Sequence, residues 1–255
     1  MMPTLVAPLA LSVLLTAPAA ADEPDPAGPQ VQRMAAFDHE PFGRIVAAVV
    51  VGERVDYAAV ARSHRPALRA YLDRIAAFDP KVLPDADRLT LYLNLYNATM
   101  IDVVVSKLAR DPKWTPAADE WGVFGEDVVR VGGRTFSLNH LENEVIRKEF
   151  DEPRIHVALV CAAVSCPPLI DAAYAPATLT TTLEENMRRF LNDPDRNRVD
   201  HRAKSLKLSQ IFEWYADDFG GREKLARYAD RYLDGDVSGY EVEFLPYDWA
   251  LNGAE

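Results

Sequence analysis

The segment over residues 89–108 is apolar around the whole circumference of a helix, and this constrains the fold more than any other feature. A helix without a polar face must be covered on all sides, so we expect this one at the centre of the fold. It nevertheless carries Asn94 and Asn97, which lie on adjacent parts of one face. A buried amide without partners costs about 1–3 kcal/mol, so each asparagine must hydrogen-bond to a specific group.

The other segments predict further helices and short strands. Asn139 and Glu142 have capping-box spacing, Thr178 is a second candidate cap, and residues 42–51 fit either a helix or a strand. We therefore expect α+β architecture, a single domain with several helices around a small, mainly antiparallel sheet. The predicted helices are 58–77, 139–150, 178–191, 210–219 and 223–233, and the predicted strands are 155–161, 205–208, 240–245 and a Gly132-Gly133 hairpin over 128–136.

The first 21 residues resemble a secretory signal. They contain no acidic or basic side chain, have an apolar core and end in small residues, and the apolar run falls short of the ~20 residues that span a bilayer. We expect residues 1–21 to be a cleaved signal peptide, with an uncleaved anchor as the alternative. Residues 22–35, rich in Pro and Asp, then form a flexible leader, and residues 36–255 form one globular domain. The protein is accordingly expected to be exported, periplasmic or secreted, without stable membrane insertion.

The formal net charge of −11 disfavours nucleic acid and anionic lipid as partners. The basic residues near residue 188 are interleaved with acidic ones, which is typical of a solvated face. No phosphate-binding loop is present, so we expect no cofactor. We expect no metal site either, because four histidines lack metal-ligand spacing: His39, His64, His140 and His201. The partner to look for is an unknown small-molecule or peptide substrate.

Both cysteines lie within residues 154–169, together with His156. If residues 155–161 form a strand, five residues at ~3.3 Å each place His156 about 16 Å from Cys161 and on the opposite face. The chain could reverse after Cys161 and bring Cys166 back alongside. Three alternatives stay open: a Cys161–Cys166 disulfide, which an exported protein permits; inert buried thiols; and a thiolate nucleophile.

Four other residues are candidates for a polar site. Asn94 or Asn97 could donate to an oxyanion or orient a base, although a structural amide is the commoner use. Glu142 and Arg147 lie on the predicted helix that ends just before the thiol segment, which makes them candidates for a polar cluster. Their structural alternatives are the return half of a capping box and an ordinary helix charge.

Several of these pieces together resemble domain-of-unknown-function family 547, and they occur in the same order over nearly the whole mature chain. The combination of an Asn-x-x-Asn helix with a Cys-x4-Cys-Pro segment is specific for membership. The matching pieces are Val55-Asp-Tyr57, Tyr92-Leu-Asn94-Leu-Tyr-Asn97, Leu141-Glu142, Ile146-Arg147, residues 154–161, Ser165-Cys-Pro-Pro-Leu169, Phe212-Glu-Trp-Tyr215 and Leu245-Pro-Tyr-Asp-Trp249.

The resemblance implies a distant relationship to papain-like or transglutaminase-like thiol folds, and thiol or glutathione-linked chemistry. It implies that Cys161 is the thiol of interest, since many relatives have Ser at the position of Cys166. It also implies a base at the position of Asn143, where many relatives have His. In this chain either the base is lost or His156 or His140 takes that role.

Two functional hypotheses follow. In the first, the protein is a thiol-dependent hydrolase or acyltransferase acting on an amide or thioester, with Cys161 as nucleophile, a histidine as base and Asn94 or Asn97 assisting. In the second, it is a non-enzymatic envelope binding protein with a structural Cys161–Cys166 disulfide and an acidic binding face.

Overall fold

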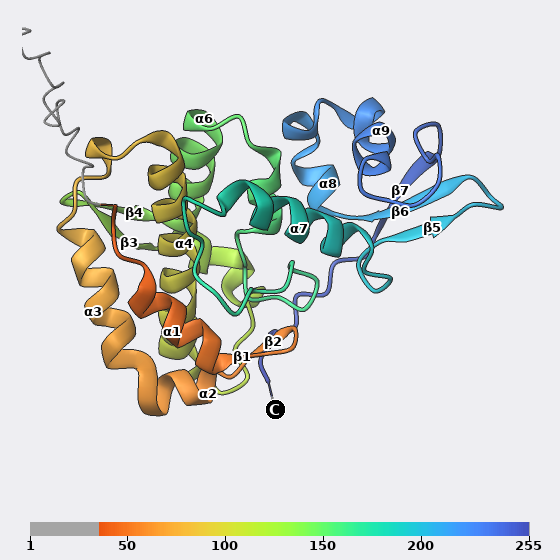
Figure 1. Ribbon diagram of the computed structural model, residues 1–255. Coiled ribbons are helices and arrows are strands. Elements are labelled where there is room, and N and C mark those ends of the chain that lie inside the picture. The colour runs from red at the N-terminus through yellow and green to blue at the C-terminus, as the bar shows by residue number, and fades with distance from the viewer. Residues whose placement is uncertain (1–35, 255) are drawn as a thin grey trace, which may run out of the picture. The chain divides into compact units, whose positions relative to one another are not determined.

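Helix α4 (Asp85–Leu108) runs through the middle of the fold in the computed structural model, which describes residues 36–254 (Figure 1). Every residue from Leu89 to Ile101 is buried, as the apolar sequence predicts. The helix begins four residues earlier than expected because Asp85 and Asp87 stabilise its positive N-terminal end. The signal peptide and leader predicted at residues 1–35 lie outside the described residues.

Helices surround α4 and continue beyond it toward a small sheet (Figure 1). Several are interrupted by short 3₁₀ or π turns, labelled η. The α-helices are α1 (Glu40–Val49), α2 (Tyr57–Ala59), α3 (Arg65–Ala76), α5 (Leu138–His140), α6 (Arg147–Glu149), α7 (Leu179–Leu191), α8 (Ile211–Trp214) and α9 (Leu225–Asp230). The π turns are η1 (Val60–His64) and η4 (Leu141–Ile146), and the 3₁₀ turns are η2 (Pro80–Val82), η3 (Ala118–Gly125), η5 (Pro153–Val157), η6 (Ala216–Phe219) and η7 (Arg222–Lys224).

The strands form three small sheets rather than the one expected. Strand β6 (Ser205–Ser209) pairs antiparallel with β5 (Arg198–Asp200) and parallel with β7 (Glu241–Leu245). The other sheets are antiparallel hairpins, β1 (Val50–Val51) with β2 (Arg54–Val55) and β3 (Asp127–Val131) with β4 (Arg134–Ser137). The predicted Gly-Gly turn joins β3 to β4, and both glycines have positive φ as such a turn requires. The α+β class is confirmed.

The strand predicted at residues 155–161 is wrong. Glu152 accepts a hydrogen bond from the backbone N–H of Arg154 and starts turn η5. The chain then runs irregularly to Cys161, because the Asn97 side chain binds the carbonyl of Ala158 and the N–H of Val160. A strand would need those two backbone groups for a ladder. Residues 158–160, whose side chains are typical of a strand, are therefore held in an irregular path by the side chain of Asn97 on the central helix.

Two helix caps also differ from the sequence prediction. Ser137, not Asn139, caps the segment that begins at Leu138, and its hydroxyl accepts from the N–H of His140. Glu142 is therefore free of any capping box and lies in π turn η4. Thr178 does occupy the N-cap position of α7, but its hydroxyl donates to the Ala175 carbonyl instead of capping the helix.

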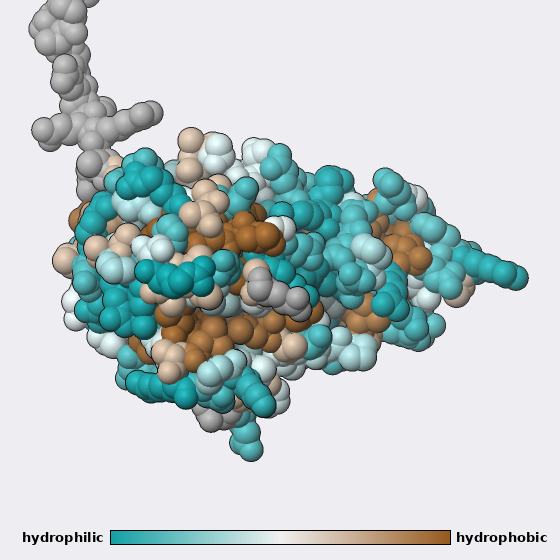
Figure 2. Space-filling model, turned by 90° about the horizontal axis from the view of Figure 1, so that it is seen from below, coloured by the Kyte–Doolittle hydropathy of each residue, from teal (hydrophilic) through white to brown (hydrophobic). Residues whose placement is uncertain are grey.

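Two hydrophobic clusters form the core. The larger one surrounds α4, and the smaller one lies among the second half of α7, β6, α8 and α9. In Figure 2 the apolar surface gathers over the half of the molecule that holds α1, α3 and α4, while the β5–β7 end is mainly hydrophilic. None of the helices within residues 36–254 is both long enough and apolar enough to cross a bilayer.

The segment after β7 runs back along the rest of the fold and pairs with it at two places. Its residues 248–252 exchange backbone hydrogen bonds with the loop that joins the two cysteines, including Asn252 N–H to the Ala162 carbonyl. Its residues 252–254 pair with Val55, and the Tyr57 hydroxyl donates to the Asn252 side chain at 2.7 Å. We call residues 246–254 the C-terminal tail. It positions Tyr247 and Trp249.

The Asn94 amide provides a test of the hydrogen bonds that hold neighbouring backbone against α4. Its Nδ2 donates to the Tyr174 carbonyl and its Oδ1 accepts from the Tyr174 N–H, each at 2.9 Å. Asn94→Leu leaves a buried N–H and a buried carbonyl without partners, which should lower the free energy of unfolding by about 2–4 kcal/mol. Urea denaturation at constant m-value measures the change. The exposed Asn139 has no side-chain bond, so Asn139→Leu should change stability by less than about 0.5 kcal/mol. Equal losses of stability in the two variants would mean that the hydrogen bonds of Asn94 to Tyr174 do not stabilise the fold.

Candidate functional site

A cavity of ≈520 Å³ lies where α4, turns η3 to η5, helix α8 and the C-terminal tail meet. Both cysteines and the buried groups Glu142 and His156 line it. Most of the wall is aromatic. The Phe, Tyr and Trp residues are Tyr96, Trp121, Phe124, Trp214, Tyr215, Tyr247 and Trp249, and the other lining residues are Asn139, Leu159, Gln210 and Ile211.

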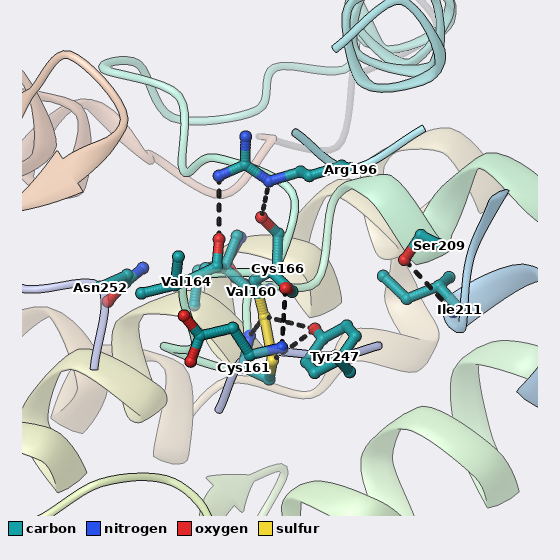
Figure 3. The surroundings of a disulfide bond; sticks show 12 residues. Val160, Cys161, Val164, Cys166, Arg196, Ser209, Ile211, Tyr247 and Asn252 are labelled. Atoms are coloured by element: carbon teal, nitrogen blue, oxygen red, sulfur yellow. Dashed lines mark hydrogen bonds between the residues drawn. A yellow bond between two sulfur atoms is a disulfide. The ribbon is translucent and has the colours of Figure 1, made fainter. Parts of the chain in front are cut away.

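Cys161 and Cys166 form a disulfide in the cavity wall (Figure 3). Their Cα atoms are 6.2 Å apart, within the ~7 Å that such a bond allows. The intervening loop needs a left-handed residue, and Ala162 takes that conformation with φ of 64°. An alanine pays a steric penalty there, which the tail offsets by donating the Asn252 N–H to the Ala162 carbonyl. Of the three alternatives open from the sequence, the structure contains the bridge.

Tyr247 and Arg196 hold the bridge from two sides. The Tyr247 hydroxyl lies 3.3 Å from each sulfur atom (Figure 3). Arg196 donates to the carbonyls of Cys166 and Val164, each at 2.9 Å, and also pairs with Glu53 and Asp193. Burial raises the pKa of Tyr247, so this hydroxyl remains a neutral donor at physiological pH. The bridge is therefore fixed to the tail and to the segment that precedes β5.

His156 has a carboxylate beside each ring nitrogen. Its Nε2 lies 2.7 Å from Asp218 Oδ2, and its Nδ1 lies 3.8 Å from Glu142 Oε1. The ring stacks on Tyr215 with the centroids 3.8 Å apart. Arg147 makes a bidentate pair with Asp218 at 2.6 and 2.7 Å and contacts the Tyr215 ring. Arg147 thus reaches the cavity only through Asp218 and Tyr215.

These neighbours change the acidity of the groups around the histidine. Burial on its own would raise the pKa of Asp218, but hydrogen bonds from His156 and Arg147 outweigh it and hold that pKa well below its usual range. Burial and the nearby Glu142 carboxylate both raise the pKa of Tyr96 and of Tyr215. Asp218 is therefore ionised and the two tyrosines are neutral at physiological pH.

Four aromatic side chains contact one another in the cavity wall, and we call them the aromatic cluster: Trp121, Trp214, Tyr247 and Trp249. Trp214 stacks on Trp249 with the centroids 5.8 Å apart, and Tyr247 lies 4.7 Å from Trp249. Trp121 meets Trp249 edge-on at 5.6 Å. Trp121 and Trp214 are 47% and 45% exposed, which is high for side chains of this size and leaves their faces open to a ligand.

The predicted site residues divide into three groups. Cys161, Cys166, His156 and Glu142 line one cavity, because the chain from His156 to Cys161 is irregular and not the predicted strand. Arg147 lies one contact away. Asn94 and Asn97 lie behind the cavity, and the backbone of residues 158–160 and of Tyr174 occupies both ends of their amides.

Sequence reasoning missed Asp218 and did not assign the aromatic cluster to the site. Asp218 follows α8 and gave no signal, because an acidic residue in a helix is ordinarily a solvated charge. The aromatic residues did carry one, since Trp214, Tyr215, Tyr247 and Trp249 lie in two of the segments behind the family resemblance. Asn143 is connected to the Arg147–Asp218 ion pair, because its Oδ1 accepts a hydrogen bond from Arg147 at 2.8 Å. Within residues 36–254 no three His, Cys, Asp or Glu side chains are placed to hold a metal ion.

Comparison with known proteins identifies a family over part of the chain. Residues 80–191 match the model of a family described as "Protein of unknown function, DUF547". The match includes both cysteines, His156 and Glu142, but ends before α8 and the C-terminal tail. No curated protein and no solved structure matches the chain.

The lowered pKa of Asp218 gives a prediction about stability and pH. A carboxyl group whose pKa is depressed in the folded state stabilises the fold above its unfolded pKa of ~3.9, and the contribution is lost as the pH falls through the lower, folded pKa. Asp218→Asn should therefore destabilise the protein at pH 7 and progressively less below about pH 4. Denaturation midpoints from pH 2 to 7 measure this.

The matched control is Asp234→Asn, because Asp234 is exposed and makes no hydrogen bond or ion pair within residues 36–254. Its curve should run parallel to that of the wild type. A constant difference between Asp218→Asn and the wild type at all pH values would mean that the ionised carboxylate does not stabilise the fold.

Proposed function

We propose that this protein binds an organic ligand with a planar or apolar group in the cavity. The family that residues 80–191 match has no known function, so the proposal rests on the cavity itself. The observation that carries the proposal is the convergence of the aromatic cluster on the cavity. Its volume of ≈520 Å³ falls in the range of ligand sites, and three of the four tryptophans in the chain line it. Exposed tryptophans around a concavity are typical of binding sites.

The disulfide favours binding over thiol catalysis. A cysteine in a disulfide has no thiolate to act as a nucleophile. Its position in the wall, tied to Tyr247 and to the Arg196 side chain, is what a bridge that shapes a cavity requires. We propose that the protein is exported, as the first 21 residues indicate, and that it binds its small-molecule or peptide ligand in the envelope or outside the cell. An oxidising compartment would keep the bridge closed.

Ligand binding can be tested with N-phenyl-1-naphthylamine, a neutral dye whose emission rises in apolar surroundings. We expect saturable one-to-one binding to the full chain. Trp214→Ala removes a ring from the wall at an exposed position, so it should weaken dye binding roughly tenfold, from ~1.5 kcal/mol of lost contact, without lowering the melting temperature.

The control is Val82→Ala, because Val82 is also exposed and apolar but does not line the cavity. Its dye affinity should equal that of the wild type. Binding that is weak and non-saturable, or equally strong in Trp214→Ala, would reject the cavity as a ligand site.

A second candidate function is the thiol-dependent hydrolase or acyltransferase, and one observation favours it: His156 and Glu142 line the same cavity as Cys161. The activity would require an external dithiol to reduce the bridge. The Cys161 thiolate would then attack an acyl carbon, His156 would give a proton to the leaving group, and water would release the acyl group from sulfur.

Intact mass after brief iodoacetamide treatment distinguishes the two. With the bridge closed, the protein gains no label before reduction and two labels after it. If the hydrolase candidate is correct, Cys161 in a Cys166→Ser variant labels at least about tenfold faster than in the denatured variant, and His156→Asn removes the difference. A Cys161 that labels no faster than in the denatured chain eliminates the enzyme.

A further inference from the structure

The cavity wall holds one carboxylate, Glu142, that is not paired with a lysine or arginine within residues 36–254. No lysine or arginine is among the described residues that line it. Two arginines that neighbour lining residues are already paired, Arg147 with Asp218 and Arg196 with Glu53 and Asp193. The charge of Asp218 is likewise balanced by Arg147. Within the described residues, Glu142 is therefore an acidic group of the cavity wall that no lysine or arginine neutralises.

Glu142 is buried without a close basic partner. The residue is 7% exposed, and the only basic group in an ion pair with it within residues 36–254 is His156, whose Nδ1 lies 3.8 Å away, beyond hydrogen-bond distance. The other nitrogen of His156 is already bound to Asp218. A buried carboxylate is unfavourable unless a cation or hydrogen-bond donors accompany it. The hydroxyls of Tyr96 and Tyr215 hydrogen-bond to Glu142 but are neutral. A positively charged ligand would supply the counter-charge that no described lysine or arginine provides.

The aromatic cluster supplies the other half of a cation site. The faces of aromatic rings are negative, so they attract ammonium groups, most strongly when the cation bears apolar substituents and the rings surround it. Trp121, Trp214, Tyr247 and Trp249 contact one another within this one wall. Burial keeps Tyr247 as a neutral phenol, so its ring binds without adding a second anion. The formal charge of −11 also attracts cations at long range.

From these features we infer that the cavity binds an organic monocation, a quaternary ammonium or an alkylated amine, with its charged head between the aromatic cluster and Glu142. The inference rests on the proposed ligand-binding function and names the chemical class of the ligand. The Glu142 carboxylate disfavours carboxylates and phosphates as ligands, because like charges repel. A cation site also explains why, in the described part of the chain, aromatic side chains and a carboxylate, without a lysine or arginine, line the same space.

The test compares two probes of the same shape and different charge: choline, and its neutral isostere 3,3-dimethyl-1-butanol. Both are titrated calorimetrically into the full chain at 150 mM NaCl, which screens the diffuse attraction of the acidic surface. We expect choline to bind at least about tenfold more tightly than the isostere. Glu142→Gln, which removes the charge at constant volume, should reduce the preference to about twofold or less.

Trp214→Leu is the second variant, because an exposed side chain can change without unfolding the protein. It keeps apolar area but loses the ring face, so it should weaken choline binding about fivefold and leave the isostere almost unaffected. Val82→Ala, outside the cavity, should leave both affinities unchanged.

The outcomes separate the two proposals. Equal binding of the two probes, or binding of neither while the neutral dye still binds, overturns the cation site and leaves the ligand cavity intact. Failure of the dye and of both probes overturns both. A choline preference that persists in Glu142→Gln and in Trp214→Leu also overturns the inference, because the charge would then be recognised elsewhere.

Discussion

The two hydrogen bonds from Asn97 to the backbone of residues 158–160 are the constraint on which the site depends. They take the backbone groups that a strand would use and hold the chain in an irregular path just before Cys161. That path is what allows His156, Leu159 and Cys161 to line one cavity, although a strand would have separated the histidine from the cysteine. A buried amide on the central helix thus substitutes for sheet pairing.

A second group of contacts connects the cavity to the polar network behind it. Asp218 binds both Arg147 and His156, and the Tyr215 ring contacts both the imidazole and the guanidinium. Each of these side chains restricts the others, so the His156 ring has a fixed orientation toward the cavity. Such fixed orientation is useful for a binding site as well as for a catalytic one, since the ligand need not order the wall itself.

The sequence was most informative where a pattern repeated along one element. The apolar circumference of residues 89–108 predicted the buried central helix, and its two asparagines were correctly expected to bind specific partners. The strand at residues 155–161 failed because its branched residues are typical of β structure, and the competing partner, Asn97, lies about sixty residues away in the chain. Local propensity contains no information about such a partner.

The candidate site was predicted in part for the same reason. Cys161, Cys166, His156 and Glu142 were singled out because their side chains carry chemistry, and all four line the cavity. The disulfide could be offered only as one of three alternatives, since the distance between the two Cα atoms depends on the turn at Ala162. Asp218 and the aromatic wall come from segments that join the site through tertiary contacts alone. Tryptophan carries no reactive group, so the search for catalytic side chains did not assign these residues to the site.

The C-terminal tail has a consequence for the order in which the protein is made. Tyr57 and its partner Asn252 are separated by 195 residues, and the loop between the cysteines is held by residues 248–252. The segments that supply Tyr96 and Glu142 to the cavity are therefore synthesised long before the tail that supplies Tyr247 and Trp249. Pairing over so long a sequence separation makes closure of the cavity slow relative to formation of the helices around it.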